Sequence, residues 1–164
     1  MRRTLLAMIL ISPVIIFGHH WRPHAQQATL SGHARVIDGD TIVIGEVHVR
    51  LFGIDAPESD QTCNDAHGAV YRCGLLATSV LEEEIGNQVV TCFPVDTDKY
   101  GRTIATCSVN GRDLGDDMVR RGQAVAYLRY SRKYEDAELE ARLARRGIFA
   151  GEFMEPEAWR HRPR

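Results

Sequence analysis

The stretch from residue 29 to residue 54 alternates apolar segments with turn signals, and this pattern restricts it to β-structure. Its three apolar segments read ATLSGHARVI, TIVI and VHVRLFGI. They are rich in β-branched residues, and they are separated by Asp and Gly at 38–40 and by Gly-Glu at 45–46. We therefore predict a three-stranded meander at the start of the folded domain.

The third of these segments carries a charge in an unusual place. Side chains alternate along a strand, so Val47, Val49 and Leu51 share one face while Arg50 points to the other. Arg50 interrupts an otherwise apolar sequence, and a half-buried arginine usually has an anionic partner. Arg50 is therefore a candidate functional residue.

The rest of the chain adds one strand pair and three helices. Residues 74–86 have apolar positions at four-residue spacing and end in Gly86-Asn87, which predicts a helix. The segments QVVTCFPV and RTIATCSV flank the turn DTDKYG and predict a hairpin. Shorter helical patterns occupy 113–121 and 134–146. Five strands and three helices indicate an α+β fold, which a five-stranded β-barrel of the OB type would close.

The first 28 residues are expected to lie outside this domain. They begin MRRTLLAMILISPVIIFG, in which two arginines precede an apolar run that is short for a membrane span. This order is typical of a secretory signal, although an uncleaved anchor or a buried first helix are alternative interpretations. We divide the chain into a signal peptide or N-terminal anchor at 1–28 and one folded domain at 29–164, exported to the periplasm or secreted.

The four cysteines support export, because an even number of cysteines in an exported chain favours disulfides over free thiols. Three pairings are possible from sequence alone. Cys63 and Cys73 lie in one loop, and Cys92 and Cys107 flank the predicted hairpin turn at similar distances, so these two pairings are favoured. Zinc bound by the first pair with His67 is the alternative, but that spacing lacks a fourth ligand.

Three acids lie at the edges of the predicted meander, namely Asp40, Asp55 and Glu58. If the fold brings them together, their oxygens are the hard ligands that calcium and magnesium prefer. Each acid can also belong to an ordinary turn, because Asp and Gly are common in turns and Pro57 ends a strand. The sequence lacks an EF-hand loop, a P-loop and a G-x-S-x-G motif.

Charge is divided unevenly along the predicted domain. Without the leader and its three arginines, 17 basic and 22 acidic groups give a formal charge of −5, whereas a general polyanion binder is expected to be basic. Residues 29–101 hold 4 basic and 12 acidic groups, and residues 102–164 hold 13 and 10. The acidic half could hold a cation and the basic half an anion, although such a split is also common on surfaces without function.

Three spaced motifs resemble the staphylococcal nuclease (thermonuclease) family. The motifs are IDGDT at 37–41, RLFGIDAPE at 50–58 and DKYGR at 98–102. They keep the family's order and spacing, and MVRRGQAVAY at 118–127 extends the similarity over nearly the whole predicted domain. The resemblance implies an OB-type barrel with three helices that hydrolyses DNA and RNA, with calcium bound beside the scissile phosphate.

The resemblance also assigns roles to the acids and their neighbours. Asp40 and Asp55 would be calcium carboxylates, Ala56 would offer its backbone carbonyl, and Thr41 would lie near the water shell of the metal. Glu58 would orient or deprotonate the attacking water.

The remaining roles concern the nucleic acid. Arg50 and Arg102 would clamp the phosphate, which suits the planar fork of a guanidinium. Positions that contact the terminal phosphate, sugar or base of a nucleotide are matched by Lys99, Tyr100 and Tyr127.

One segment departs from the family pattern. After Glu58 the type member is lysine-rich, whereas SDQTCNDAHGAVYRC here is nearly neutral. Fewer basic groups predict weaker binding with a shallower salt dependence. Affinity would then rest on basic residues of the second half, namely Arg120, Arg121, Arg129, Arg132 and Lys133.

Three functions compete at this point. The first is a calcium-dependent nuclease in which water attacks phosphorus in line and the 5′-oxygen leaves. The second is a non-catalytic, nucleic-acid-binding OB-type module, and the third is a disulfide-stabilised envelope protein without a ligand. All five predicted acids and arginines are retained, which favours the nuclease, and nothing in the sequence requires a protein partner, so a monomer is expected.

Overall fold

The structure, a computed structural model, describes residues 28–163. The predicted signal peptide or anchor at 1–28 therefore lies outside the described residues, apart from Ala28. Among the residues described, none of the helices combines the length and apolar character needed to span a bilayer.

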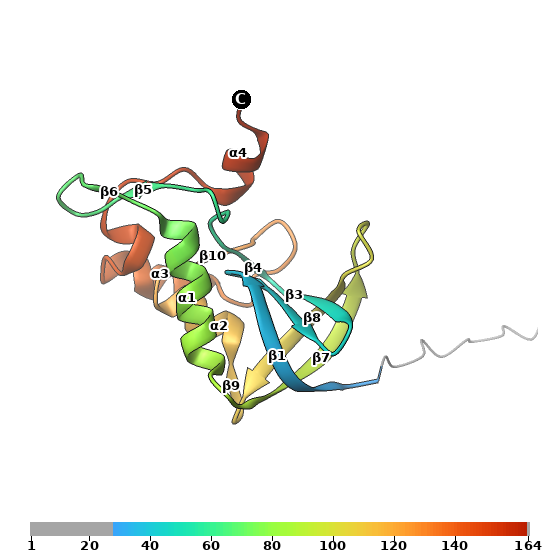
Figure 1. Cartoon of the computed structure of the whole chain (residues 1–164). Coiled ribbons are helices and arrows are strands. Elements are labelled where there is room, and N and C mark those ends of the chain that lie inside the picture. The colour runs from blue at the N-terminus through green and yellow to red at the C-terminus, as the bar shows by residue number, and fades with distance from the viewer. Residues whose placement is uncertain (1–27, 164) are drawn as a thin grey trace, which may run out of the picture.

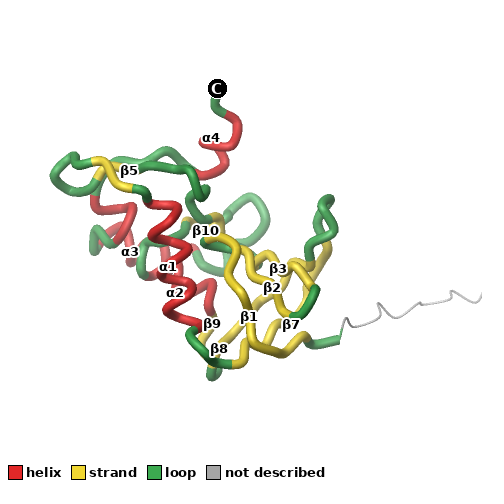
Figure 2. Tube along the Cα trace, viewed as in Figure 1, coloured by secondary structure: helices red, strands yellow, loops and turns green. Residues whose placement is uncertain are grey.

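Five strands close into a barrel (Figures 1 and 2). They are β1 (Leu30–Asp38), β2 (Thr41–Ile44), β3 (Val47–Leu51), β7 (Val89–Thr97) and β8 (Thr103–Val109). The first three form the predicted antiparallel meander, and β7 pairs with β8 as the predicted hairpin. Antiparallel pairing of β1 with β7 and parallel pairing of β3 with β8 complete the ring. The α+β class and the five-stranded OB-type barrel are confirmed.

The three predicted helices are present and gather on one side of the barrel (Figure 2). They are α1 (Cys73–Ile85), α2 (Leu114–Arg120) and α3 (Glu135–Leu143). Two elements that the sequence patterns did not predict follow them, the 3-10 helix η1 (Gly147–Ala150) and the short helix α4 (Pro156–His161). Six residues are too few for a helical period to be recognised, and α4 buries only Pro156.

Short ladders organise the connections. They are formed by β4 (Ile54–Asp55) with β10 (Val125–Ala126), by β5 (Cys63–Asn64) with β6 (Val70–Tyr71), and by β9 (Arg112–Asp113) with β8. The loop in which the sequence placed Cys63 and Cys73 thus contains the short β5–β6 ladder. The β4–β10 pairing ties the end of the meander to the segment after α2, next to the acids.

The core confirms the alternation predicted for the third strand. Val49 and Leu51 are 0% and 1% exposed, whereas Arg50 points away from them. The helical patterns were less accurate at their margins. The helix α3 ends at Leu143, three residues before the predicted limit at 146, whereas α1 matches its predicted range to within one residue at each end.

Both favoured disulfides are present. Cys63 is bonded to Cys73 at the start of α1, and Cys92 is bonded to Cys107 directly across the β7–β8 ladder. The zinc alternative is wrong, because the sulfurs of the first pair are used in a covalent bond and His67 is exposed. Two disulfides fit an oxidising compartment.

Candidate active site

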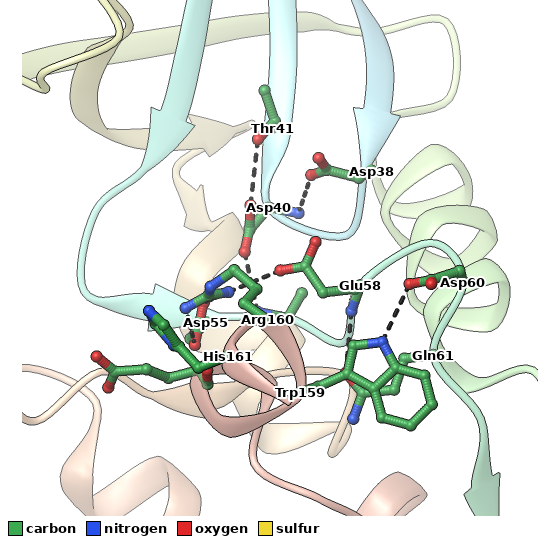
Figure 3. Close-up of polar contacts among 12 residues, drawn as sticks. Asp38, Asp40, Thr41, Asp55, Glu58, Asp60, Gln61, Trp159, Arg160 and His161 are labelled. Atoms are coloured by element: carbon green, nitrogen blue, oxygen red, sulfur yellow. Dashed lines mark hydrogen bonds and ion pairs between the residues drawn. The ribbon is translucent and has the colours of Figure 1, made fainter. Parts of the chain in front are cut away.

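The predicted acids meet at one end of the barrel because a tight turn joins β1 to β2. The backbone N–H of Asp40 donates to Asp38 Oδ1 at 3.1 Å, which fixes this turn (Figure 3). A Cβ on Gly39 would come within 2.7 Å of the Ala56 Cβ and 2.8 Å of the Ala77 Cβ. Only glycine therefore allows the turn to approach Ala56, the residue that follows Asp55 at the end of β4.

Arg50 bridges the two predicted metal acids. Its Nη2 donates to Asp55 Oδ1 at 2.9 Å, and its Nη1 forms an ion pair with Asp40 Oδ2. Asp55 is 1% exposed and the Arg50 side chain is 12% exposed. Burial lowers the pKa of Arg50 from its ordinary value, and the charge of Asp55 opposes this change. The anionic partner expected for Arg50 is thus a pair of carboxylates.

Asp40 also contacts the two residues predicted beside the metal. Its Oδ2 accepts the backbone N–H of Ala56 at 2.9 Å, and its Oδ1 accepts the hydroxyl of Thr41 at 3.1 Å. The oxygens of Asp40 and Asp55 both meet the single guanidinium of Arg50, so they lie within the span of one cationic group. Their donor chemistry fits calcium or magnesium.

Two carboxylates would supply only part of the shell of a calcium ion, which takes 6–8 oxygens. Within residues 28–163 no three His, Cys, Asp or Glu side chains form a ready-made metal cluster. Backbone carbonyls such as that of Ala56, together with water, would have to provide the remaining ligands.

Arg102 is held at the same end of the barrel by Asp98. Its Nε donates to Asp98 Oδ2 at 2.7 Å, and its Nη1 donates to the Thr41 hydroxyl at 3.3 Å. Asp98 also accepts the backbone N–H groups of Tyr100 and Arg102. Burial raises the pKa of Asp98, but these hydrogen bonds outweigh it, and the pKa lies below its ordinary value. The turn therefore aims Arg102 toward the acids through Thr41.

Glu58 lies beside the acids in a segment that α1 and the C-terminal region hold in place. Gly74 in α1 packs so closely that a Cβ there would overlap the Glu58 carbonyl oxygen at 1.7 Å. The Glu58 N–H donates to Oε1 of Gln61 at 3.1 Å. Gln61 is fully buried, and its Nε2 donates to the Met154 carbonyl at 2.7 Å. The Glu58 carboxylate remains about one third exposed and faces the site.

Sequence reasoning missed Arg160 of α4. Its Nη1 and Nη2 each donate to an oxygen of Asp55 at 2.9 Å, and Nη1 also contacts Glu58 Oε1 at 2.7 Å (Figure 3). Burial lowers the pKa of Arg160, but the hydrogen bonds to Asp55 and Glu58 outweigh it and raise the pKa. No local signal marked this residue, since the contact spans 105 positions and the surrounding sequence contains several arginines.

The residues predicted to bind the nucleotide occupy two places. Lys99 and Tyr100 lie at the tip of the β7–β8 turn, where Tyr100 is 73% exposed and the Lys99 ammonium lies 4.9 Å from its ring centre. Tyr127 is closer to the acids, and burial followed by the charge of Asp55 raises its pKa. It lines a cavity of about 290 Å³ together with Asp55 and Leu128.

The basic residues expected to supply affinity are all engaged by acids. Their ion pairs are Arg120 with Asp116 and Glu140, Arg121 with Glu84, Arg129 with Glu157, Arg132 with Glu135, and Lys133 with Asp113. These side chains are therefore less available to phosphates than the sequence suggested.

An OB-type barrel with carboxylates and arginines gathered at one end defines a class of sites suited to cations and anionic substrates. Comparison with known proteins shows to which family a chain with this fold and site belongs. Residues 48–151 match the family described as staphylococcal nuclease homologue. The chain belongs to the staphylococcal nuclease family.

Individual relatives differ in how much they share with this chain. The succinoglycan biosynthesis protein ExoI of Rhizobium meliloti is 41% identical over 96 residues, which are 57% of this chain and 50% of ExoI. An uncharacterized endonuclease of Escherichia coli is 30% identical over 159 residues, which are 92% of this chain and 96% of that protein. A probable endonuclease of Schizophyllum commune is 30% identical over 122 residues, covering 63% and 40%. Family and relatives together support a nuclease.

Proposed function

We propose that the protein is a calcium-dependent endonuclease that hydrolyses the phosphodiester bonds of DNA and RNA. The observation that carries the proposal is the bridge from Arg50 to Asp40 and Asp55, with Glu58 and Arg102 at the same end of the barrel. This reaction requires acids that bind a cation, an acid that activates water, and arginines that bind the phosphate. Family membership and the endonuclease relatives support the same reaction.

In the proposed reaction each side chain has a separate task. Glu58 accepts a proton from the attacking water, which its partial exposure permits. Arg50 and Arg102 donate N–H groups to the phosphoryl oxygens as their charge develops, and the 5′-oxygen leaves in line with the attack. Calcium, held by Asp40, Asp55 and the Ala56 carbonyl, would supply charge neutralisation at the phosphate.

The nucleotide would extend from the acids toward the exposed hairpin tip on one side and Tyr127 on the other. Lys99 and Tyr100 would contact a phosphate and a sugar or base, and Tyr127 would line the cavity beside Asp55. We further propose that the chain acts as a monomer after export. The two disulfides and the N-terminal signal pattern support the oxidising compartment.

The test is the release of soluble nucleotides from DNA and from RNA by the full-length protein, with calcium and then with a chelator. Activity should require calcium. Glu58→Gln and Arg102→Ala should each lower kcat by about 100-fold or more, because each removes a group that acts in the transition state. Glu46→Gln, a matched change on the exposed β2–β3 turn, should leave kcat unchanged.

Hydrolysis in the presence of chelator, or full activity in both site variants, would contradict the proposed mechanism. Binding of nucleic acid without hydrolysis would instead favour the non-catalytic module.

A further inference from the structure

The C-terminal helix α4 lies beside the acid cluster of Asp40, Asp55 and Glu58, and polar contacts hold it there (Figure 3). The indole N–H of Trp159 donates to Asp60 Oδ1 at 3.0 Å, and Arg162 pairs with the same carboxylate at 3.3 Å. Pro156 is the one buried residue of the helix. Burial of apolar surface is the main force that anchors a helix, so α4 is attached more weakly than α1 to α3.

Arg160 uses the carboxylate oxygens that a cation would need. Each carboxylate oxygen offers two acceptor positions. Oδ1 of Asp55 already accepts from both Arg50 and Arg160, and its Oδ2 accepts from Arg160. Three of the four positions on Asp55 are thus filled, and an oxygen of Glu58 is engaged as well. A cation can approach these acids fully only if a guanidinium leaves.

Of the two arginines, Arg160 is the one that can leave. Arg50 belongs to a barrel strand, its side chain is 12% exposed, and it is fixed between two acids. Arg160 is 32% exposed and sits on a six-residue helix near the chain end. Undocking α4 would expose Pro156 and the half-buried Trp159, whereas moving Arg50 would leave two buried carboxylates without their partner.

The charge balance points in the same direction. Three carboxylates and the guanidiniums of Arg50 and Arg160 leave the cluster with a formal charge of −1. Without Arg160 the charge is −2, which balances one divalent cation. The docked arginine therefore opposes cation binding both by occupying oxygens and by its charge.

We propose that α4 is an autoinhibitory strap in which Arg160 and calcium compete for Asp55 and Glu58. In the metal-free protein Arg160 neutralises the acids and keeps them ordered. Calcium binds as Arg160 withdraws and α4 detaches from Asp60. The strap rests on the proposed function, because it assumes that Asp55 binds calcium.

Calcium affinity, measured by titration calorimetry on the full-length protein, tests the competition without using activity. Arg160→Gln should bind calcium about tenfold to a hundredfold more tightly than wild type, because calcium no longer has to displace the arginine from the carboxylates. Arg35→Gln removes the same charge from an exposed position on β1 and should leave the affinity within about twofold, since charges on the surface are screened. Asp55→Asn should abolish binding.

The outcomes of these measurements distinguish a failure of the strap proposal from a failure of the proposed calcium site. If Asp55→Asn abolishes binding but Arg160→Gln binds no more tightly than wild type, the strap is wrong and the proposed calcium site stands. Weaker binding of an oligonucleotide to Arg160→Gln at unchanged calcium affinity would make Arg160 a phosphate ligand, which also overturns the strap. If neither wild type nor Arg160→Gln binds calcium, both proposals fail.

Release of the helix can be followed through Trp159, whose ring lies 3.4 Å from the Arg162 guanidinium. The other tryptophan of the chain is Trp21, so a Trp21→Phe background leaves one reporter. Calcium should shift the emission of Trp159 to the red as its hydrogen bond to Asp60 breaks and water reaches the ring. Emission that stays constant while calorimetry shows binding would overturn the release of α4.

Discussion

At the scale of single residues, the site depends on one guanidinium with two partners. Arg50 could be singled out from sequence because a charge within an apolar strand requires a partner, and the structure provides Asp40 and Asp55. Arg160 could not be found in this way, since nothing near it in sequence indicates which distant carboxylates it meets. The acids themselves resembled turn residues until the motifs were considered together.

Arg50→Lys tests whether the fork of Arg50 matters beyond its charge. Lysine carries a point charge and cannot donate from two fixed nitrogens to Asp40 and Asp55 at once. We expect kcat to fall by about 100-fold to 1,000-fold, as for loss of a transition-state donor. Arg35→Lys on exposed β1 is the matched control. Equal activity of Arg50→Lys and wild type would show that charge alone suffices.

Gln61→Leu tests how Glu58 is held. The substitution keeps a buried side chain of similar size but leaves the Glu58 N–H and the Met154 carbonyl without their partner. Both hydrogen bonds are partly buried, and each contributes about 1 kcal/mol, so the free energy of unfolding in urea should fall by about 1–3 kcal/mol in total. His67→Leu, exposed in the same loop, should change it by less than about 0.5 kcal/mol. Similar values for the two variants would show that Gln61 is not a structural tie.

At the scale of elements, those held by apolar burial could be predicted from the sequence, and the element held by polar contacts could not. The strand β3 buries Val49 and Leu51 at a spacing of two, and the helix α1 buries Ala77, Leu81 and Ile85 at a spacing of four, so both patterns are visible in the sequence. The disulfide across β7 and β8 followed from the symmetry of Cys92 and Cys107 about a turn. Helix α4 is held by ion pairs and an indole hydrogen bond, and such contacts produce no hydrophobic periodicity in the sequence.

The contact between α2 and α3 yields a prediction about pH. Tyr134, 2% exposed, donates its hydroxyl to Asp113, whose carboxylate also caps the N-terminus of α2. Burial, followed by the charge of Asp113, raises the pKa of Tyr134 well above its ordinary value of 10.0. The group stays protonated in the folded state at a pH where the unfolded chain ionises. The contribution of the Tyr134 hydroxyl to the free energy of unfolding is therefore complete below about pH 10 and declines as the pH rises further.

Tyr134→Phe should accordingly lower the free energy of unfolding by about 1.5–3 kcal/mol at neutral pH, the usual value for a hydrogen bond to a charged group. The difference from wild type should shrink above about pH 10. Urea denaturation of both proteins between neutral and alkaline pH measures it. A difference that stays constant with pH would show that folding does not raise the pKa of Tyr134.

At the scale of the whole molecule, sequence composition overstated the basic surface. The second half of the chain has an excess of basic residues, yet the structure pairs the five named for affinity with acids. Pairing of this kind depends on the fold and cannot be counted from composition. The arginines directed toward the site are Arg50, Arg102 and Arg160, and Lys99 lies at the hairpin tip.

The salt dependence of nucleic-acid binding measures how many phosphates the surface engages. Each neutralised phosphate of a single strand contributes about −0.7 to the slope of log K against log salt. Contacts from Arg50, Arg102 and Lys99 alone predict a slope near −2 for a labelled oligonucleotide bound to Glu58→Gln with calcium. Glu135→Gln removes the partner of Arg132 and should steepen the slope by up to about 0.7 if that arginine then reaches a phosphate.

A slope near −5 in the protein with its ion pairs intact would instead require about seven phosphate contacts. The paired arginines would then have to leave their acids to bind the strand, and the neutral loop after Glu58 would not limit affinity.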